Sequence, residues 1–278
     1  MSRLHVVHTT TFSYDRPVSA SFNEARMLPV SDRDQTVLSA SLGIDPLSWR
    51  HDYVDYWGTQ TTAFESSEPH SRLVLTATSR VEVHPRPRPA PQSWALLRLP
   101  GTLDTMAEFL EVSPTTTPPE ALAAIAAEAA AAGDPDSTAR RICAAVHSTV
   151  EYVPGVTAVH SVGSEAWEAR KGVCQDMAHL SVGALRSVGI PARYVSGYLH
   201  PAGDGEIGHT VMGESHAWVE WWVGHWVAHD PTNDIDVGEH HVALGRGREY
   251  QDVAPVRGIF AGGASQLLDV QVRITREA

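Results

Sequence analysis

The stretch Gly172-Val-Cys-Gln-Asp-Met-Ala-His-Leu180 runs from a glycine that breaks one predicted helix to a cysteine in the first turn of the next. Unpaired backbone N–H groups at a helix start carry a partial positive charge, which favours the thiolate form of Cys174. The same N–H groups would receive the oxyanion that forms when a thiolate attacks a carbonyl carbon. Cys174 is therefore a candidate nucleophile, with a buried structural thiol as the alternative.

Two later segments supply a base and a carboxylate for this thiol. Ser215-His-Ala-Trp-Val-Glu220 begins a predicted strand, and the next predicted strand ends at His229-Asp230. A tight turn near Gly224 joins the two strands, so the start of the first lies beside the end of the second. His216 and Asp230 are thus predicted neighbours, and a carboxylate beside an imidazole fixes its tautomer and stabilises the imidazolium.

These segments, in this order, resemble the transglutaminase-like superfamily, and more closely its bacterial two-domain members with an N-terminal β domain. The resemblance rests on blocks spread over nearly the whole chain: Phe22-Asn-Glu-Ala-Arg-Met-Leu-Pro29, Gly172-Val-Cys-Gln-Asp176, Gly189-Ile-Pro-Ala-Arg-Tyr-Val-Ser-Gly-Tyr198, Ser215-His-Ala-Trp-Val-Glu220, Asp230-Pro-Thr-Asn233 and Gly247-Arg-Glu-Tyr-Gln-Asp-Val-Ala-Pro255. Met177 and Tyr56-Trp-Gly-Thr59 depart from the family pattern, away from the triad. The resemblance implies that Cys174 is the nucleophile, His216 the base, and Asp230 the residue that orients the histidine.

The resemblance also implies the chemistry. Such a triad performs thiol-dependent acyl transfer on an amide or peptide bond through a thioester, which water or a second amine then resolves. We expect a cysteine peptidase or amidase, because no sequence feature indicates a site that excludes water. The alternatives are a protein-glutamine transamidase that cross-links proteins and a catalytically inactive binding module with the same fold.

The rest of the chain predicts an α+β protein of two domains. Residues 1–84 read as an N-terminal antiparallel β-sandwich, because short runs rich in Val, Thr and Leu alternate with turn clusters. Residues 85–92 are rich in proline and predict a linker. Residues 93–278 predict a papain-like transglutaminase core with a helical lobe and an antiparallel sheet. Its predicted helices are Pro118–Ala132, Asp136–Val150, Ser164–Arg170 and Cys174–Val188, and its predicted strands are Arg193–Leu199, His216–Val223, Trp226–His229 and Leu267–Thr275.

The net charge and the lengths of the apolar runs limit the kinds of partner that we expect for this chain. The 278-residue chain carries a formal net charge of −12, which argues against nucleic acid or an anionic membrane as partner. No apolar run is long enough for a signal peptide core or a membrane span, so we expect a cytoplasmic protein that acts on a peptide or protein amide. Homo-oligomer formation stays open.

We expect no cofactor and no metal. Only two cysteines occur, Cys143 and Cys174, and Cys143 lies on the apolar face of a predicted helix as a core residue. Four histidines near His216 have no metal-binding spacing and read as surface or loop residues: His225, His229, His240 and His241. Tyr152 and Trp167 are the two candidates for a second donor to the oxyanion.

Overall fold

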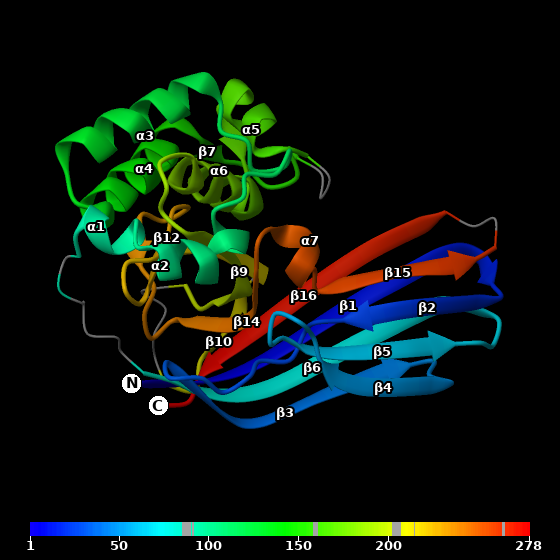
Figure 1. The fold of residues 1–278 in the computed structure, drawn as a ribbon. Helices are drawn as coiled ribbons and strands as arrows, with labels where there is room; N and C mark the ends of the chain where they lie inside the picture. Colours follow the sequence, from blue (N-terminus) through cyan, green and yellow to red (C-terminus); the bar gives the residue numbers. More distant parts are fainter. Residues whose placement is uncertain (85–89, 91, 158–160, 202–206, 214, 263–264) are drawn as a thin grey trace.

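In the computed structural model the described residues are 1–84, 90, 92–157, 161–201, 207–213, 215–262 and 265–278. They form a β part and a mixed α/β part that lie side by side (Figure 1). The predicted α+β class, with an N-terminal β-sandwich and a transglutaminase-like core, is confirmed. Among the described residues, no helix has the length and apolar character needed to cross a membrane.

The β part is a sandwich of two antiparallel sheets. The first has the strand order β10-β16-β1-β6-β3 and the second the order β15-β2-β5-β4. Their bounds are β1 Ser2–Val18, β2 Ala20–Ala25, β3 Gln35–Asp45, β4 Trp49–Val54, β5 Gln60–Ser66, β6 His70–Val83, β10 Thr210–Gly213, β15 Val256–Ala261 and β16 Gln266–Arg276. The sheets pack through one cluster of buried side chains, which includes Val18, Phe64 and Leu75. Alternation in β1 sends Leu4 and Val6 to the buried face, as strand geometry requires.

The last two strands correct the predicted domain boundary. The prediction placed all of residues 93–278 in the catalytic core, whereas β15 pairs with β2 and β16 pairs with β1 along its whole length. Without these pairings β1 and β2 would be open edges with unpaired backbone groups, which native sheets avoid. In sequence, the mixed α/β part therefore lies between strands of the sandwich, and β10 within this stretch also joins the first sheet. Most of the predicted linker, residues 85–89 and 91, lies outside the described residues.

The mixed part combines helices with a five-stranded antiparallel sheet of order β13-β12-β11-β9-β14. The sheet strands are β9 Ala192–Leu199, β11 Ser215–Trp222, β12 Trp226–Asp230, β13 Ile235–Asp236 and β14 His241–Gly247, with a small parallel pair β7 Glu151–Tyr152 and β8 Lys171–Gly172. The helices are α1 Trp94–Leu97, α2 Pro100–Thr105, α3 Glu120–Ala132, α4 Pro135–Thr149, α5 Gly163–Ala169, α6 Cys174–Ser187, α7 Tyr250–Val253 and the 3-10 helix η1 Ala107–Phe109.

Helix α6 is the central element of this part, because every residue from Gln175 to Arg186 is buried. It packs against α3, α4 and α5 on one side and against β9 and β11 on the other. Gly183 permits a close approach, since an added Cβ would lie 1.5 Å from the carbonyl oxygen of Thr116. Burial on all sides fixes the position of the α6 start, where Cys174 lies.

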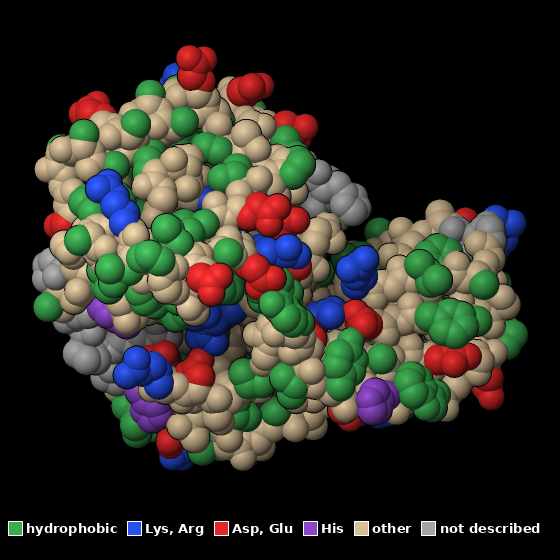
Figure 2. Space-filling view, in the orientation of Figure 1, with side chains coloured by type: hydrophobic (Ala, Val, Ile, Leu, Met, Phe, Trp, Pro, Cys, Tyr) green, Lys and Arg blue, Asp and Glu red, His purple; other side chains and the backbone are tan. Residues whose placement is uncertain are grey.

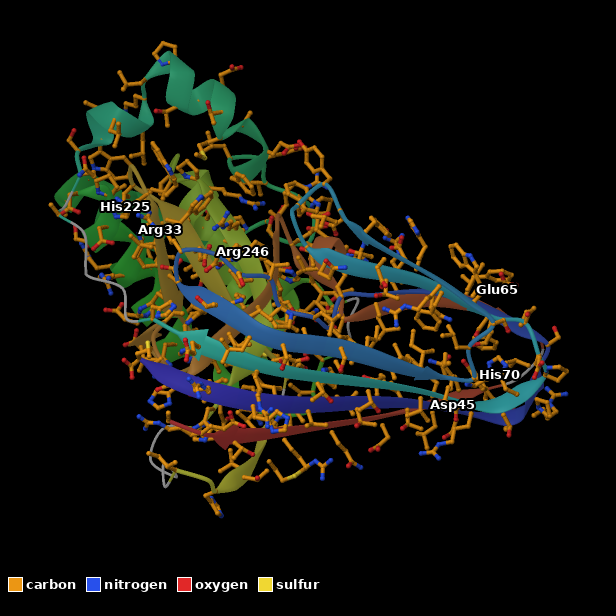
Figure 3. The ribbon with its side chains drawn as sticks, turned by 90° about the horizontal axis from the view of Figure 1, so that it is seen from below. Arg33, Asp45, Glu65, His70, His225 and Arg246 are labelled. Carbon is orange, nitrogen blue, oxygen red and sulfur yellow. The ribbon has the colours of Figure 1, made fainter. Side chains whose placement is uncertain are left out.

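A cluster of charged side chains joins the five-stranded sheet of the mixed part to the β part. Because the mixed part holds the candidate residues Cys174, His216 and Asp230, we call it the catalytic part and its five-stranded sheet the catalytic sheet. Glu220 of β11 is 1% exposed and accepts hydrogen bonds from Arg193 at 2.7 Å and from Arg246 at 3.1 Å. Arg246 also pairs with Asp32 of the β part at 2.9 Å. Figure 3 shows Arg246 near the ends of β3 and β6, where the two parts meet. Because the one buried carboxylate serves two half-buried guanidinium groups, its loss would remove an ionic partner from both of them.

We therefore expect Glu220→Ala to lower the free energy of unfolding by about 3–5 kcal/mol, the usual effect of breaking a buried ion pair from one side. Urea unfolding followed by circular dichroism measures the change. Glu277→Ala is the matched control, because its pair with Arg80 at 3.0 Å is exposed and should contribute less than about 1 kcal/mol. Equal effects of the two substitutions would contradict the structural role of the cluster.

Candidate active site

Cys174 is the first residue of α6 and is half-buried. The residue before it, Val173, is extended, and its N–H donates to Asp176 Oδ2 at 2.8 Å. Thr157 donates to the same carboxylate oxygen at 2.7 Å. Asp176 thus fixes the loop that enters α6, a structural role also held by His179, whose Nε2 accepts from the Tyr250 N–H at 3.1 Å. In the first turn the N–H groups of Asp176 and Met177 donate to the Val173 carbonyl at 3.0 and 3.2 Å, and Cys174 lies at the positive end of the helix.

His216 and Asp230 meet through the β11–β12 hairpin. The register pairs Val219 with His229, and the turn uses Gly224 at a φ of 86°. His216 Nε2 lies 2.7 Å from Asp230 Oδ2, and Asp230 is fully buried. Cys174 lies beside His216, close enough for its thiol to influence the pKa of the imidazole, and both side chains line one cleft. Since Nε2 faces the carboxylate, Nδ1 is the ring nitrogen left for the sulfur. The structure therefore brings together all three side chains that the sequence proposed as a triad.

The electrostatics of this group favour a charged histidine. Burial alone would lower the pKa of His216, but hydrogen bonds to Asp230 and Cys174, with the negative charge on both, raise it to about 10. Burial would likewise raise the pKa of Asp230, yet hydrogen bonds from His216 and His241 hold it well below its usual range. At neutral pH the pair is thus imidazolium and carboxylate. An imidazolium beside a thiol stabilises the thiolate, which is the nucleophilic form.

Asp230 is held by its own turn. Oδ1 accepts from the backbone N–H groups of Thr232 at 2.9 Å and Asn233 at 3.3 Å, and Oδ2 accepts from Asn233 Nδ2 at 2.7 Å. His241 Nε2 lies 3.5 Å from the same Oδ2. The backbone N–H of Gly238 points to Nδ1 of this histidine at 3.4 Å, which leaves the proton on Nε2, facing Asp230. Both oxygens of the carboxylate therefore have protein hydrogen-bond partners.

The prediction that the four neighbouring histidines are surface or loop residues was wrong for two of them. His229 and His241 are 5% and 4% exposed. His229 contacts Asp234 at 3.0 Å and Asp236 at 3.3 Å, so each buried ring has a carboxylate neighbour. Both lie on strands of the catalytic sheet, at positions that alternation sends inward. Within the described ranges, no three His, Cys, Asp or Glu side chains are grouped to hold a metal ion.

Cys174 and His216 line a cleft of about 840 Å³ between the two parts of the molecule. Figure 2 shows the concave junction between the rounded catalytic part and the β part. Of the two candidate oxyanion donors, Tyr152 lines this cleft, whereas Trp167 packs against the hydrophobic core of the catalytic part. Trp167 is not among the described residues that line the cleft, so Tyr152 is the candidate that we retain.

Sequence reasoning missed several residues of the site. Tyr194 of β9 lines the cleft and is buried, and burial, together with the nearby charge of Cys174, raises its pKa well above the ordinary range. The turn sequence Asp230-Pro-Thr-Asn233 did carry a signal for Asn233, because Asp side chains commonly accept hydrogen bonds from the N–H groups two and three residues on. The cleft residues of β1 and β16 carried no such signal, since only the fold places them near Cys174.

Comparison with known proteins gives matches to both parts. Residues 4–82 match the model of the bacterial transglutaminase-like N-terminal region, and residues 123–231 match that of the transglutaminase-like superfamily. An uncharacterized protein of Mycobacterium leprae is 42% identical over 279 residues, covering 100% of both chains. A protein-glutamine gamma-glutamyltransferase of Pseudomonas aeruginosa is 33% identical over 130 residues, which cover 43% of this chain and 19% of that one.

Among solved structures, a protein from Cytophaga hutchinsonii that is provisionally named a cysteine protease superposes with a TM-score of 0.79. Its sequence is 21% identical, and the match covers 100% of this chain and 92% of that one. The likeness extends over both the β part and the catalytic part, so the position of the mixed part between sandwich strands in the sequence belongs to an architecture that another protein shares.

Proposed function

This chain belongs to the transglutaminase-like superfamily, and from that premise we propose that it is a cysteine hydrolase that cleaves amide or peptide bonds through a Cys174–His216–Asp230 triad. Members of the superfamily are typically cysteine-based enzymes. The observation that carries the proposal is one connected arrangement in a cleft: a thiol at a helix start beside His216, whose Nε2 lies 2.7 Å from the buried Asp230.

The first half of the proposed reaction forms a thioester. The Cys174 thiolate bonds to the amide carbonyl carbon, and the oxygen takes the negative charge beside the first-turn N–H groups of α6. Tyr152 is the side chain best placed to add a second hydrogen bond, because it lines the same cleft. As the C–N bond breaks, imidazolium His216 gives its proton to the departing amine, which leaves an acyl group on sulfur.

The second half releases the acyl group. Neutral His216 takes a proton from water, and the resulting hydroxide attacks the thioester carbon. The C–S bond breaks, the carboxylic acid leaves, and the thiolate–imidazolium pair is restored. Asp230 keeps the histidine in one orientation through both halves and stabilises its positive charge. The same scheme ends in a new amide when a primary amine replaces water.

Transamidation is the second candidate, favoured by one observation. The Pseudomonas aeruginosa relative is named a protein-glutamine gamma-glutamyltransferase and shares 33% identity over 130 residues. That match covers 43% of this chain. We retain hydrolysis as the proposed outcome, because nothing in the described lining of the cleft forms a separate pocket for a second amine.

Product analysis separates these outcomes. We expect wild-type protein, incubated with a mixture of glutamine-containing peptides, to produce new carboxyl groups, and to do so equally with excess methylamine present. Mass spectrometry identifies each product: the acyl group ends as a carboxylic acid or as a methylamide, and the displaced amine is ammonia from a glutamine side chain or the second peptide from a cleaved peptide bond. Methylamides as the main products would make the protein a transamidase. No product from wild-type protein, with the same peptides unchanged by Cys174→Ala, would favour the inactive binding module.

A further inference from the structure

The wall of the cleft opposite the triad comes from the β part. Strands β1, β15 and β16 contribute Phe12, Val256, Phe260, Leu268 and Val270 to the lining. The first and last strands of the chain therefore shape the space in front of Cys174, although neither contains a member of the triad. None of these wall residues takes part in the bond-breaking steps described above. Their apolar character therefore bears on what the cleft binds.

Strand register places the side chains of this wall in one continuous row. Three cross-strand pairs of β1 and β16 share one face of the sheet, and all six residues line the cleft: Thr10 with Val270, Phe12 with Leu268 and Tyr14 with Gln266. Directly paired side chains lie side by side on one face of a sheet. These six side chains form the part of the wall that we call the floor of the cleft. The floor is apolar in its centre and polar at its ends.

The apolar centre of the floor is open. Leu268 is 52% exposed and Val270 is 44% exposed, although both lie in a concave surface. Covering such apolar surface is favourable in proportion to its area. An occupant with a bulky apolar group would therefore gain free energy by lying on this floor.

The residues that line the cleft also favour an apolar occupant over a charged one. The chain has a net charge of −12, yet no Asp, Glu, Lys or Arg is found among the described residues that line the cleft. A charged group lying on the β1–β16 side of the cleft, away from Cys174 and His216, would lose hydration without gaining an ionic partner there. The lining thus discriminates against charged substituents close to the reacting amide.

The edge of the sheet favours an extended peptide over a compact amide. On the side of β16 away from β1, strand β10 covers only Val272–Thr275. Within the described part of the chain, Gln266–Gln271 has no strand neighbour on that side. Such an edge can pair with the backbone of an extended peptide, whose alternate side chains then reach the floor.

Resting on the proposed function, we propose that β1 and β16 form a substrate subsite, centred on Phe12 and Leu268, for a bulky apolar side chain of an extended peptide beside the amide that Cys174 attacks. The substrate class is accordingly a peptide or unfolded protein segment with Leu, Ile, Met or Phe within a few residues of the cleaved bond. The subsite sets the preference among substrates, and the triad performs the reaction on whatever the subsite holds.

A peptide mixture digested by the full-length protein tests the subsite. Mass spectrometry of the products reads the residues on both sides of each cleaved bond. We expect bulky apolar residues to be enriched on one side, and Leu268→Ser to reduce kcat/KM for those peptides roughly 10-fold. Leu267→Ser is the matched control, because Leu267 is 71% exposed, pairs with Ser13 on the opposite face and does not line the cleft. We expect it to keep the wild-type preference.

A binding measurement keeps the test independent of turnover. Fluorescence anisotropy with the Cys174→Ala protein compares a labelled leucine-rich hexapeptide with an aspartate-rich one, and we expect the first to bind roughly 10-fold tighter. Adding Leu268→Ser should remove that difference. Cleavage without apolar preference, or equal effects of the two serine substitutions, would overturn the subsite and leave the hydrolase. Leucine-selective binding without cleavage would support the subsite and contradict the proposed hydrolase. If the protein neither bound nor cleaved the peptides, both proposals would be overturned.

Discussion

Replacing Cys174 by alanine is expected to reduce amide cleavage by roughly 10⁴-fold or more, the scale of loss when a covalent nucleophile is removed from a triad. The physical reason is that no thioester can form, so the barrier reverts to direct attack by water on an unactivated amide. The loss should appear in kcat, because the cleft and its floor remain intact. Single-turnover and steady-state rates on the best cleaved peptide measure it.

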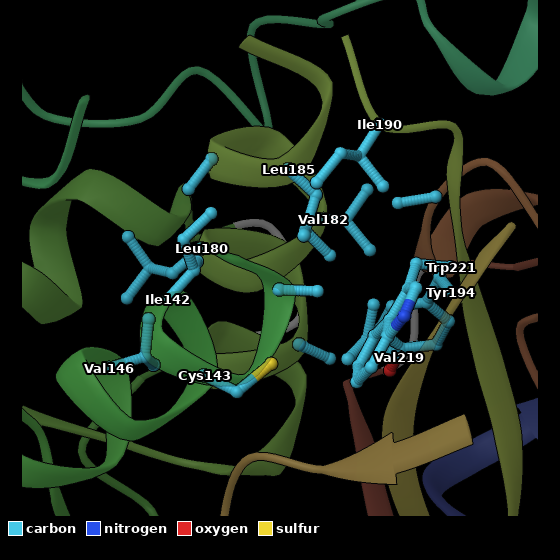
Figure 4. Packing of buried hydrophobic residues seen from close by; sticks show 14 of the residues in the cluster. Ile142, Cys143, Val146, Leu180, Val182, Leu185, Ile190, Tyr194, Val219 and Trp221 are labelled. Atoms are coloured by element: carbon cyan, nitrogen blue, oxygen red, sulfur yellow. The ribbon is translucent and has the colours of Figure 1, made fainter. Parts of the chain in front are cut away.

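Cys143 provides the matched control for this substitution. It is the second cysteine of the chain and is buried in the core of the catalytic part, where burial raises the pKa of its thiol to about 12. Figure 4 shows it packed among Ile142, Val146 and Leu180. Cys143→Ala should therefore keep its rate of cleavage while losing some stability. If Cys174→Ala retained activity and Cys143→Ala lost it, the assignment of the nucleophile would be wrong.

The second large effect is expected from Asp230→Asn. The carboxylate of Asp230 is one of the two groups that raise the pKa of His216 to about 10, against the opposing effect of burial. With a neutral amide in its place, the pKa of His216 should fall toward or below the ordinary value of about 6.5. We expect activity at neutral pH to drop by roughly 10²- to 10⁴-fold, because the imidazolium and its orientation are both lost.

The pH dependence of kcat tests the direction of the expected change in the pKa of His216. In the wild type the imidazolium persists until the pH approaches the raised pKa of His216, so the alkaline limb of kcat should lie near pH 10. In Asp230→Asn that limb should move to lower pH, and NMR titration of the His216 ring should follow it. Asp236→Asn is the control, since Asp236 contacts His229 and Arg140 instead. An alkaline limb that did not move would exclude Asp230 as the group that charges His216.

The candidate site could be predicted from the sequence because its parts are local. A helix start and one hairpin bring Cys174, His216 and Asp230 to three element ends; Gly172 precedes the helix and Gly224 forms the turn of the hairpin. The observed α6 and β12 begin at the predicted residues and end within one residue of the prediction, and β11 lies within one residue at each end. Their apolar periodicity and turn residues are encoded within a few residues of each other.

Other features could not be predicted from the sequence, because they depend on pairing between strands that are far apart in the chain. Strand β2 has the polar sequence Ala20-Ser-Phe-Asn-Glu-Ala25, and β15 is interrupted by Gly258, so neither shows the apolar alternation that predicts a strand. Strand β16 was found, but a period of two does not say which sheet a strand joins. His241 was missed as a partner of Asp230 for the same reason, because β14 reaches the site only through its pairing with β9.

The pairing of β1 with β16 also sets an order for folding during synthesis. Tyr14 pairs with Gln266, so one edge of β1 has no partner until almost the entire chain has left the ribosome. At 5–20 residues per second the wait is on the order of tens of seconds. Cys174, His216 and Asp230 are all synthesised before β16, which supplies Gln266, Leu268 and Val270 to the floor of the cleft. The nascent protein would then carry its nucleophile before it acquires the wall that we propose selects a substrate.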